Sequence, residues 1–323
     1  MTSVKVAGDI KNNAIGYAKV SGTWRMCSAF ANVSNVWKAV SDMGYSLFGG
    51  GYYSTPTDKT DKYAHSTDAV STGTVLGLGR YGLGACGNAT IGIFAGGTTG
   101  SITDYSDKYT HSTDVVSAGT VLGHARNYVS GVGHSTIGLF VGGYDTNITA
   151  FVDKYTYSND NVAAGTALST ARQRGAATGN ATLGVYGAGT GAGYYTSTEK
   201  YTHSDDSVAS GGTLGEARRG PAATGNTTIG IFAGGLNSST HTSDYTDKYT
   251  YSSDAVAPGT VIGHTKQEVS GGGNSVIGLF GGGNAYGTYT DKYTYSSDAV
   301  APGTALTYDF YMRSAISSSP GGF

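Results

Sequence analysis

The stretch TTIGIFAGG, residues 227–235, decides the fold, because variants of it recur five more times along the chain. Each copy joins aliphatic residues to one aromatic residue and a pair of small residues. The six cores are LFGGG (47–51), IFAGG (93–97), LFVGG (139–143), VYGAG (185–189), IFAGG (231–235) and LFGGG (279–283). Their aromatic residues are 46 positions apart four times and then 48. A fixed period of this length indicates one supersecondary unit, copied around a ring or along a stack.

One repeat, residues 218–266, predicts four short antiparallel strands. RGPAATG (219–225) predicts an inner strand of small residues, and Gly225-Asn226 predicts a tight reversal through positive φ angles. TTIGIFAGG is the second strand and DKYTYS (247–252) the third. SSDAVAPG (252–259) predicts a turn and TVIG (260–263) a fourth strand. The third strand alternates Asp and Tyr with Lys, Thr and Ser, so one of its faces is expected to be buried and the other wet.

A glycine in the middle of the second strand recurs in five of the six copies. Glycine weakens a strand, so its presence indicates that another part of the chain packs closely against the backbone there. The recurring residues are Gly92, Gly138, Gly184, Gly230 and Gly278.

Six copies of a four-stranded unit predict an all-β chain folded as a six-bladed β-propeller, in which each sheet buries its faces against its neighbours. We expect residues 44–323 to form the propeller and residues 1–43 a small N-terminal β segment. The array begins at a second strand, Tyr45 to Gly51, so another segment must supply the first blade's inner strand. The segment that starts at Arg313 is the favoured candidate, and Val36–Val40 is the alternative.

Composition narrows the function classes. The chain has 323 residues with 53 Gly and 25 Tyr, and its formal net charge of −2 gives no general attraction to nucleic acid or anionic membranes. No apolar run is as long as a membrane span, and residues 1–13 lack a signal-peptide pattern, which predicts folding in a cytosol. Two cysteines make no disulfide framework, and Cys86 occupies the repeat position of Thr178 and Thr224, so we expect a buried strand residue there.

The order of elements resembles the kelch repeat: a basic residue, a small inner strand, a turn, an aliphatic-aromatic-Gly-Gly strand, a variable loop and a tyrosine-bearing strand. The likeness covers residues 44 to about 318. The Trp expected near the fourth kelch strand is missing, and Val75, Val121 and Val261 stand there. The resemblance implies a propeller, while this departure argues against a eukaryotic kelch adaptor.

The N-terminal segment carries a second resemblance. AKVSGTWR (18–25) and ANVSNVWK (31–38) are two copies of a Val-turn-Trp-basic hairpin. Such hairpins resemble the attachment segments of bacteriophage tail-fibre and related virion proteins, which implies attachment through Trp24 and Trp37. The alternative is a small β cap under the propeller in which both tryptophans anchor a core.

One face of the propeller is expected to carry the function. The loop between the second and third strands and the link to the next blade both end there, and these loops vary most in length and content. Repeat arrays confine such variation to their binding face. The tyrosines that we expect on its rim, suited to stacking on sugars or protein aromatics, are Tyr52, Tyr53, Tyr144, Tyr194, Tyr195 and Tyr286.

The links on the same face each carry one cation. These are Arg80, Arg126, Arg172, Arg218, Lys266 and Arg313. A cationic ring near the axis can hold phosphate or carboxylate groups, but the equivalent residue in kelch repeats supports its own blade. Both roles stay open at this stage.

No catalytic, metal-binding or cofactor-binding motif stands out, so the sequence predicts no enzyme, metal site or cofactor. Asp254 and Asp298 are interpreted as turn-capping residues. His65, His111 and His203 share a repeat position with tyrosines in the other blades, which favours packing over ligation.

These observations predict a non-enzymatic phage virion component, such as a tail or head fibre or spike protein. It would attach to other virion proteins through residues 1–43 and display a face that binds a host-surface glycan or protein, with no nucleic acid or membrane insertion and with self-association an open possibility. An intracellular kelch-type scaffold is the second predicted function, and a glycan-active enzyme is the third.

Overall fold

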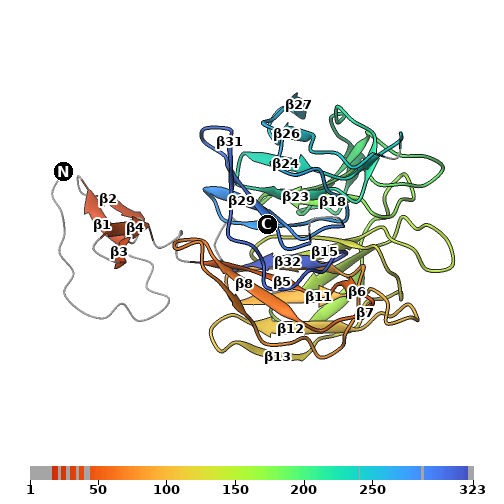
Figure 1. Ribbon diagram of the computed structural model, residues 1–323, viewed down its shortest axis with the longest axis horizontal. Helices are drawn as coiled ribbons and strands as arrows, with labels where there is room; N and C mark the ends of the chain where they lie inside the picture. Colours follow the sequence, from red (N-terminus) through yellow and green to blue (C-terminus); the bar gives the residue numbers. More distant parts are fainter. Residues whose placement is uncertain are drawn as a thin grey trace.

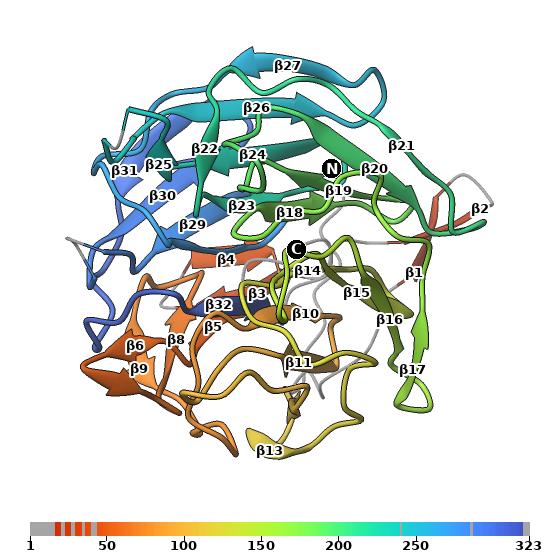
Figure 2. The same ribbon diagram turned by 90° about the vertical axis from the view of Figure 1, so that its right-hand side faces the viewer.

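The computed structural model describes residues 44–239, 241–284 and 287–318, together with four short strands before residue 40. The described residues form strands and turns only, and six four-stranded sheets surround a common axis (Figure 2). The predicted all-β, six-bladed propeller is therefore confirmed. Within the described ranges, no helix has the length and apolarity to cross a membrane.

Each sheet, or blade, orders its strands from the axis outwards. Blade 1 contains β32 (Ser314–Ser317), β5 (Tyr45–Gly49), β8 (Thr60–Ala64) and β9 (Val70–Thr72); blade 2 contains β10 (Gly84–Gly87), β11 (Ile91–Ala95), β12 (Ser106–Thr110) and β13 (Val115–Ala118); blade 3 contains β14 (Ser130–Gly133), β15 (Ile137–Val141), β16 (Val152–Thr156) and β17 (Asn161–Ala164). Blade 4 contains β18 (Ala176–Gly179), β19 (Leu183–Gly187), β20 (Thr198–Thr202) and β21 (Val208–Ser210); blade 5 contains β23 (Ala222–Gly225), β24 (Ile229–Ala233), β26 (Thr246–Thr250) and β27 (Ala255–Pro258); blade 6 contains β28 (Ser270–Gly273), β29 (Ile277–Gly281), β30 (Thr290–Thr294) and β31 (Ala299–Pro302).

The C-terminal strand closes the ring. β32 pairs antiparallel with β5, and the register places Ile316 opposite Leu47. β32 also contacts the inner strands β10 and β28 of the blades on either side. The favoured closure is confirmed. The alternative is wrong, because β4 (Val36–Ala39) pairs with β3 (Phe30–Val33) in a hairpin, just as β1 (Tyr17–Val20) pairs with β2 (Thr23–Met26).

Two local predictions need correction. The fourth strand of blade 5 is Ala255–Pro258 and not residues 260–263, because Asp254 adopts a left-handed φ of 57° and reverses the chain earlier than expected. Pro258 fits there because an edge strand forms only one ladder of hydrogen bonds. The turn after β23 does not use positive φ at Asn226. Instead, Asn226 Oδ1 accepts hydrogen bonds from the N–H groups of Thr228 and Ile229.

The hydrophobic core lies between neighbouring blades. Leu47 and Ile316 of blade 1 pack with Leu83, Phe94 and Tyr109, which belong to blade 2 and the link into it, in one buried cluster. Equivalent clusters fill the other spaces between blades. Burial of this apolar surface needs a neighbouring blade on each side. The ring therefore stabilises sheets that would not be stable as single copies.

The mid-strand glycines admit a side chain from the preceding blade. A Cβ atom at Gly138 would lie 2.2 Å from Cys86 Sγ, and one at Gly230 would lie 2.4 Å from Thr178 Cγ2. The predicted close packing is thus confirmed, and so is the buried position of Cys86 in β10. Blade 1 reverses this arrangement: it carries Ser46 in place of the glycine, and the facing residue of blade 6 is Gly272.

A ring of surface ion pairs also joins each blade to the next. Each lysine of a third strand reaches the aspartate at the outer turn of the following blade. The pairs are Lys62–Asp114, Lys108–Asp160, Lys154–Asp206, Lys200–Asp254, Lys248–Asp298 and Lys292–Asp68. Exposed pairs contribute at most about 1 kcal/mol each, so they align blades that the core already holds together. Every one of these aspartates has a positive φ, and for Asp254 and Asp298 the expected turn role is confirmed.

Removal of residues 314–323 should open the propeller, because β5 would lose its inner partner and expose an unpaired edge. We expect aggregation or a lowered unfolding temperature, measured by circular dichroism and size-exclusion chromatography. Removal of residues 319–323 alone serves as the control and should leave unfolding unchanged. Equal stability of both truncated chains would contradict this closure.

Gly272→Thr should destabilise the propeller by about 1–3 kcal/mol, because a Cβ atom there would lie 2.7 Å from Ser46 Oγ. The double variant Gly272→Thr with Ser46→Gly recreates the arrangement of the other blades. In urea unfolding, we expect the double variant to lose less free energy of unfolding than the two single variants lose together, by at least about 1 kcal/mol. Simple additivity would refute the proposed exchange of side chain and glycine.

Candidate functional site

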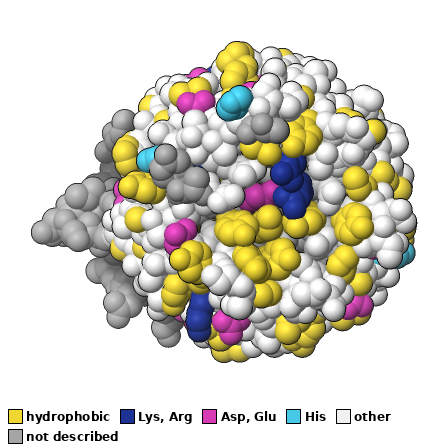
Figure 3. All heavy atoms as spheres, turned by 45° about the vertical axis from the view of Figure 1, so that its right-hand side comes forward, with side chains coloured by type: hydrophobic (Ala, Val, Ile, Leu, Met, Phe, Trp, Pro, Cys, Tyr) yellow, Lys and Arg dark blue, Asp and Glu magenta, His cyan; other side chains and the backbone are white. Residues whose placement is uncertain are grey.

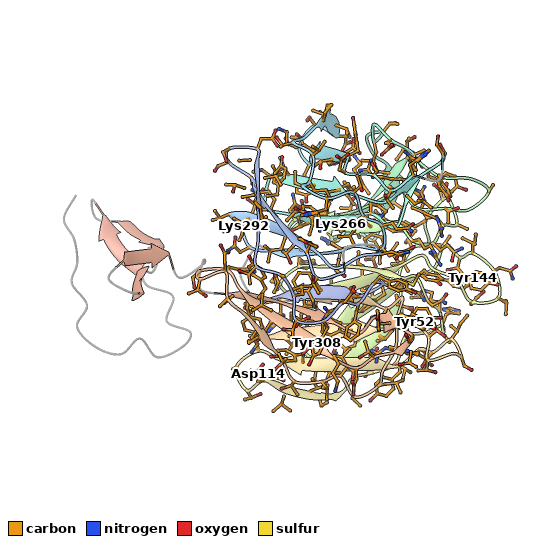
Figure 4. The ribbon with its side chains drawn as sticks, viewed as in Figure 1. Tyr52, Asp114, Tyr144, Lys266, Lys292 and Tyr308 are labelled. Atoms are coloured by element: carbon orange, nitrogen blue, oxygen red, sulfur yellow. The ribbon has the colours of Figure 1, made fainter. Side chains whose placement is uncertain are left out.

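The loops and links meet on one face of the propeller, as predicted. In five of the blades, the loop after the second strand forms an antiparallel bridge with the incoming link: Tyr52 with Tyr311, Tyr81 with Thr98, Asn127 with Tyr144, Gln173 with Thr190, and Gln267 with Asn284. In blade 5, β22 (Arg218–Arg219) pairs with β25 (Leu236–Asn237) at the same place. Tyr52 and Tyr144 lie on this loop-rich face, and Asp114 lies on the opposite one (Figure 4).

Six link residues form an axial ring at the centre of the loop-rich face. All six have φ between 53° and 62°, the left-handed region. Their backbones form a closed cycle in which each N–H donates to the carbonyl of the preceding blade, at N···O distances between 2.6 and 3.3 Å. The residues, in order, are Gly82, Tyr128, Arg174, Gly220, Glu268 and Met312. This cycle fixes the height and direction of every link at the axis.

Three side chains of the axial ring form a plug over the axis. The Tyr128 ring lies against Gly82, and Glu268 lies against Gly220, where a Cβ atom would lie only 3.0 Å from Glu268 Cδ. The Arg174 guanidinium stacks 3.8 Å from the centre of the Tyr128 ring, and its Nη1 donates to Glu268 Oε1 at 2.5 Å. The side chains of Arg174 and Glu268 are only 15% and 9% exposed. The two charges therefore neutralise each other at the centre of the face.

The channel beneath the plug is narrow. A cavity of about 110 Å³ follows the axis, and the inner strands line it with small residues such as Ala85, Gly131 and Ala177. This volume suits a few water molecules. A ligand larger than a few water molecules therefore does not fit inside the channel.

The residues that precede the axial ring form a middle ring around it. Its members are Tyr81, Asn127, Gln173, Arg219, Gln267 and Tyr311. Tyr52 packs edge-on against two of them, with ring centres 4.9 Å from Tyr81 and 5.7 Å from Tyr311. Burial and then the neighbouring tyrosines raise the pKa of Tyr81 and of Tyr311. Both hydroxyls therefore stay protonated and can donate hydrogen bonds at neutral pH.

Two amides flank the tyrosine pair. Around the axis, Gln267 precedes Tyr311, Tyr81 follows, and Asn127 comes next. The side-chain oxygens Asn127 Oδ1 and Gln267 Oε1 are buried without a hydrogen-bond partner, and Asn127 is only 7% exposed. We call these four residues, with Tyr52 behind them, the tyrosine arc. A buried amide oxygen without a partner costs about 1–3 kcal/mol, so both oxygens favour a bound donor, whether water or a ligand hydroxyl.

The predicted cationic ring lies inside the blades. Arg80, Arg126, Arg172, Arg218 and Lys266 are fully buried, and Arg313 is nearly so. Each pairs with a buried carboxylate of the third strand: Arg80–Asp107, Arg126–Asp153, Arg172–Glu199, Arg218–Asp247, Lys266–Asp291 and Arg313–Asp61, at 2.5 to 3.0 Å. Each also donates to at least one backbone carbonyl in the second strand or directly after it. This geometry favours the blade-supporting role over ligand binding.

Arg313 reaches its carboxylate from a different backbone position. By repeat register, Phe310 stands where Arg80 and its equivalents stand, and Arg313 occupies the position of Leu83 three residues later. Arg313 Nη1 nevertheless lies 2.7 Å from Asp61 Oδ2. The equivalence of Arg313 with the other cations therefore holds for its charge but not for its place in the repeat.

The predicted rim tyrosines divide by role. Tyr195 stacks on Arg172, with the guanidinium 4.9 Å from the ring centre, and the hydroxyl of Tyr194 accepts a hydrogen bond from Arg219 Nε. Tyr53 is 60% exposed and Tyr144 is half-buried. Only Tyr52 of this set belongs to the tyrosine arc. Tyr286 lies outside the described residues, and so do the side chains of Trp24 and Trp37, whose backbones lie in β2 and β4.

The tyrosine arc contains four residues that the sequence analysis did not select. A signal was available: Tyr81, Asn127 and Gln267 directly follow a ring cation, at a position that changes in almost every copy of an otherwise repetitive link. Tyr311 was hidden by the shifted position of Arg313. Only the closed ring shows that residues from blades 6, 1, 2 and 3 form one arc.

The histidines at the shared repeat position pack against neighbouring side chains. His65 Nε2 lies 2.9 Å from Ser46 Oγ, and His111 Nδ1 lies 3.0 Å from the Tyr45 hydroxyl. Burial lowers the pKa of His65, His111 and His203 to about 4, so all three are uncharged at neutral pH. Across the part of the chain that the structure describes, no three His, Cys, Asp or Glu side chains gather closely enough to hold a metal ion.

Comparison with known proteins gives no assignment: no protein-family model matches the chain, and no curated protein matches it significantly. The function must therefore be argued from the geometry of the loop-rich face.

Arg126→Ala should destabilise the protein by about 3–5 kcal/mol, because it leaves the buried Asp153 carboxylate without its partner. Arg126→Lys should cost much less, since Lys266 fills the same role in blade 6. Urea unfolding measures both changes. A loss for Arg126→Ala below about 1 kcal/mol would show that the pair does not support the blade.

Proposed function

We propose that this chain is a non-catalytic binding protein whose loop-rich face recognises a partner, while residues 1–43 attach it to a larger assembly. The tyrosine arc carries the proposal. It combines half-buried aromatic rings with unpartnered hydrogen-bond acceptors, on the face where the six copies differ most. Tyrosine supplies a large contact area at a small cost in conformational entropy, which is why recognition surfaces favour it.

The scaffold supports this assignment through its rigidity. The axial hydrogen-bond cycle and the buried ion pairs hold every link, so the arc is ordered before a partner arrives. Binding to a prearranged surface avoids most of the entropic cost of ordering loops. On the loop-rich face that Figure 3 brings forward, hydrophobic and tyrosine side chains surround a small group of charged ones.

The proposed setting is a phage virion, as a fibre or spike component. Its support is the resemblance of residues 18–25 and 31–38 to virion attachment segments, together with their pairing as two short hairpins. An intracellular kelch-type scaffold would use the same face, but no observation on the described residues favours it. A glycan-active enzyme would need catalytic groups that the tyrosine arc does not contain.

Immunogold electron microscopy with antibodies against the chain tests the setting on phage particles from a culture that carries the gene. We expect label at the tail or head fibres. In a pull-down, the full chain should bind these particles and a chain of residues 44–323 should not. Absence of label on intact particles, with the chain present only in the soluble fraction, would refute the virion assignment.

A further inference from the structure

We propose that the tyrosine arc is a binding site for an uncharged saccharide. The inference rests on the proposed function and names the chemical class of its ligand. Among the described residues of the loop-rich face, aromatic rings and unsatisfied amide oxygens occur together in one sector. This sector contains Gln267, Tyr311, Tyr81 and Asn127 in sequence around the axis, with Tyr52 behind the tyrosine pair.

The aromatic part of the arc matches the apolar face of a sugar ring. Tyr52, Tyr81 and Tyr311 are all half-buried, so each ring is anchored on one side and open to solvent on another. Their T-shaped contacts, with interplanar angles of 69° and 65°, place neighbouring rings at steep angles to one another. Such a corner offers ring faces in two directions to the C–H groups of a pyranose, and the hydroxyls of the same rings supply donors.

The amides add two acceptors to those of the tyrosine hydroxyls. Asn127 Oδ1 and Gln267 Oε1 have no partner among the described residues, and they lie at the two ends of the arc. Sugar hydroxyls are donors of the right kind, and they reach these oxygens when the amide side chains turn toward the face. A site whose polar groups stay unpaired without its ligand discriminates strongly in favour of that ligand.

Electrostatics select an uncharged ligand. The ionised groups that act on the tyrosine pair, Arg174 on Tyr81 and Glu268 on Tyr311, neutralise each other through a hydrogen-bonded pair. Arg219, which neighbours Gln267 in the middle ring, donates a hydrogen bond to the Tyr194 hydroxyl. The guanidinium of Arg174 is further covered by its stacking on Tyr128. The buried cations of the links are occupied by carboxylates, so none is available to a phosphate, sulfate or uronate group. A charged saccharide would lose hydration over Tyr81 and Tyr311, where Arg174 and Glu268 are already paired with each other.

The size of the site fixes how the saccharide binds. The axial cavity is too small for a hexose, so the sugar lies across the surface of blades 1 and 2 and their two neighbours. A site this open binds a short segment of a polymer and leaves both ends of the chain free. Affinity for one segment is expected to be modest, and several copies on one assembly would raise it through multivalency.

A glycan array of neutral and acidic oligosaccharides, probed with the full chain, tests this inference. We expect retention of one or more neutral hexose oligomers, and isothermal titration with the best of them should give an affinity that hardly changes with salt. Tyr81→Ala and Tyr311→Ala should each weaken binding at least about tenfold. Tyr81→Phe should weaken it less, because it keeps the ring and loses only the hydroxyl.

Tyr53→Ala is the matched control. Tyr53 neighbours Tyr52 on β6 (Tyr52–Tyr53) and is 60% exposed, yet it lies outside the arc. This variant should keep its affinity within about twofold, and thermal unfolding should confirm that all variants fold. Equal losses for Tyr53→Ala and Tyr81→Ala would overturn the assignment of the site.

Two outcomes would overturn the ligand class. If the chain bound only acidic oligosaccharides and this binding weakened with salt, the ligand would be a charged saccharide and not an uncharged one. Retention of no saccharide would refute the inference, and it would leave the proposed function to a separate measurement. That measurement is binding of the labelled chain to intact host envelopes, with Tyr81→Ala compared with Tyr53→Ala. Envelope binding that depends on Tyr81 but is not inhibited by sugars would indicate a protein partner.

Discussion

The loop-rich face depends on the ion pair between the buried carboxylate of each third strand and the cation of the link. Asp107 accepts from Arg80 through one oxygen and from the backbone N–H of Gly77 through the other. Asp153 does the same for Arg126 and Gly123. One side chain thus holds the cation and the chain that leads to it, and the residues directly after the cation are the ones that reach the axis. The position of the link is therefore fixed independently of the residues on the loop-rich face.

Closure of the ring brings the six links, each held by its own ion pair, together in one continuous face. Each blade's inner strand packs on the next blade, and the axial hydrogen-bond cycle runs once around the molecule through six left-handed residues. Four of the six are not glycine, although left-handed φ strains other residues. The strain is tolerated because each N–H and carbonyl in the cycle has a fixed partner. In return, Tyr128, Arg174 and Glu268 are held over the axis, where they form the plug.

The six copies are alike as a scaffold and unlike as a surface. Their buried cations and carboxylates are nearly interchangeable, even where Arg313 must reach Asp61 from a shifted position. The middle ring, in contrast, is aromatic near blades 1 and 2 and polar or charged elsewhere. This division separates stability from recognition: a change in the middle ring alters what the face presents and leaves the buried pairs intact.

The repeat pattern alone determined the number of blades, the antiparallel strands and the side on which loops and links meet, because hydrophobic periodicity and turn residues act over a few positions. It also predicted that something packs on Gly138 and Gly230, although it could not name Cys86 and Thr178 as the packing residues. The fourth-strand position was missed, because the outermost strand has one bonded edge and little apolar content to mark it. Ring closure decided the rest: the match of Ser46 with Gly272, the burial of the cations, and the arc of Gln267, Tyr311, Tyr81 and Asn127. The buried pair Arg313–Asp61 joins residues 252 positions apart, and only the curvature of packed blades brings such residues together.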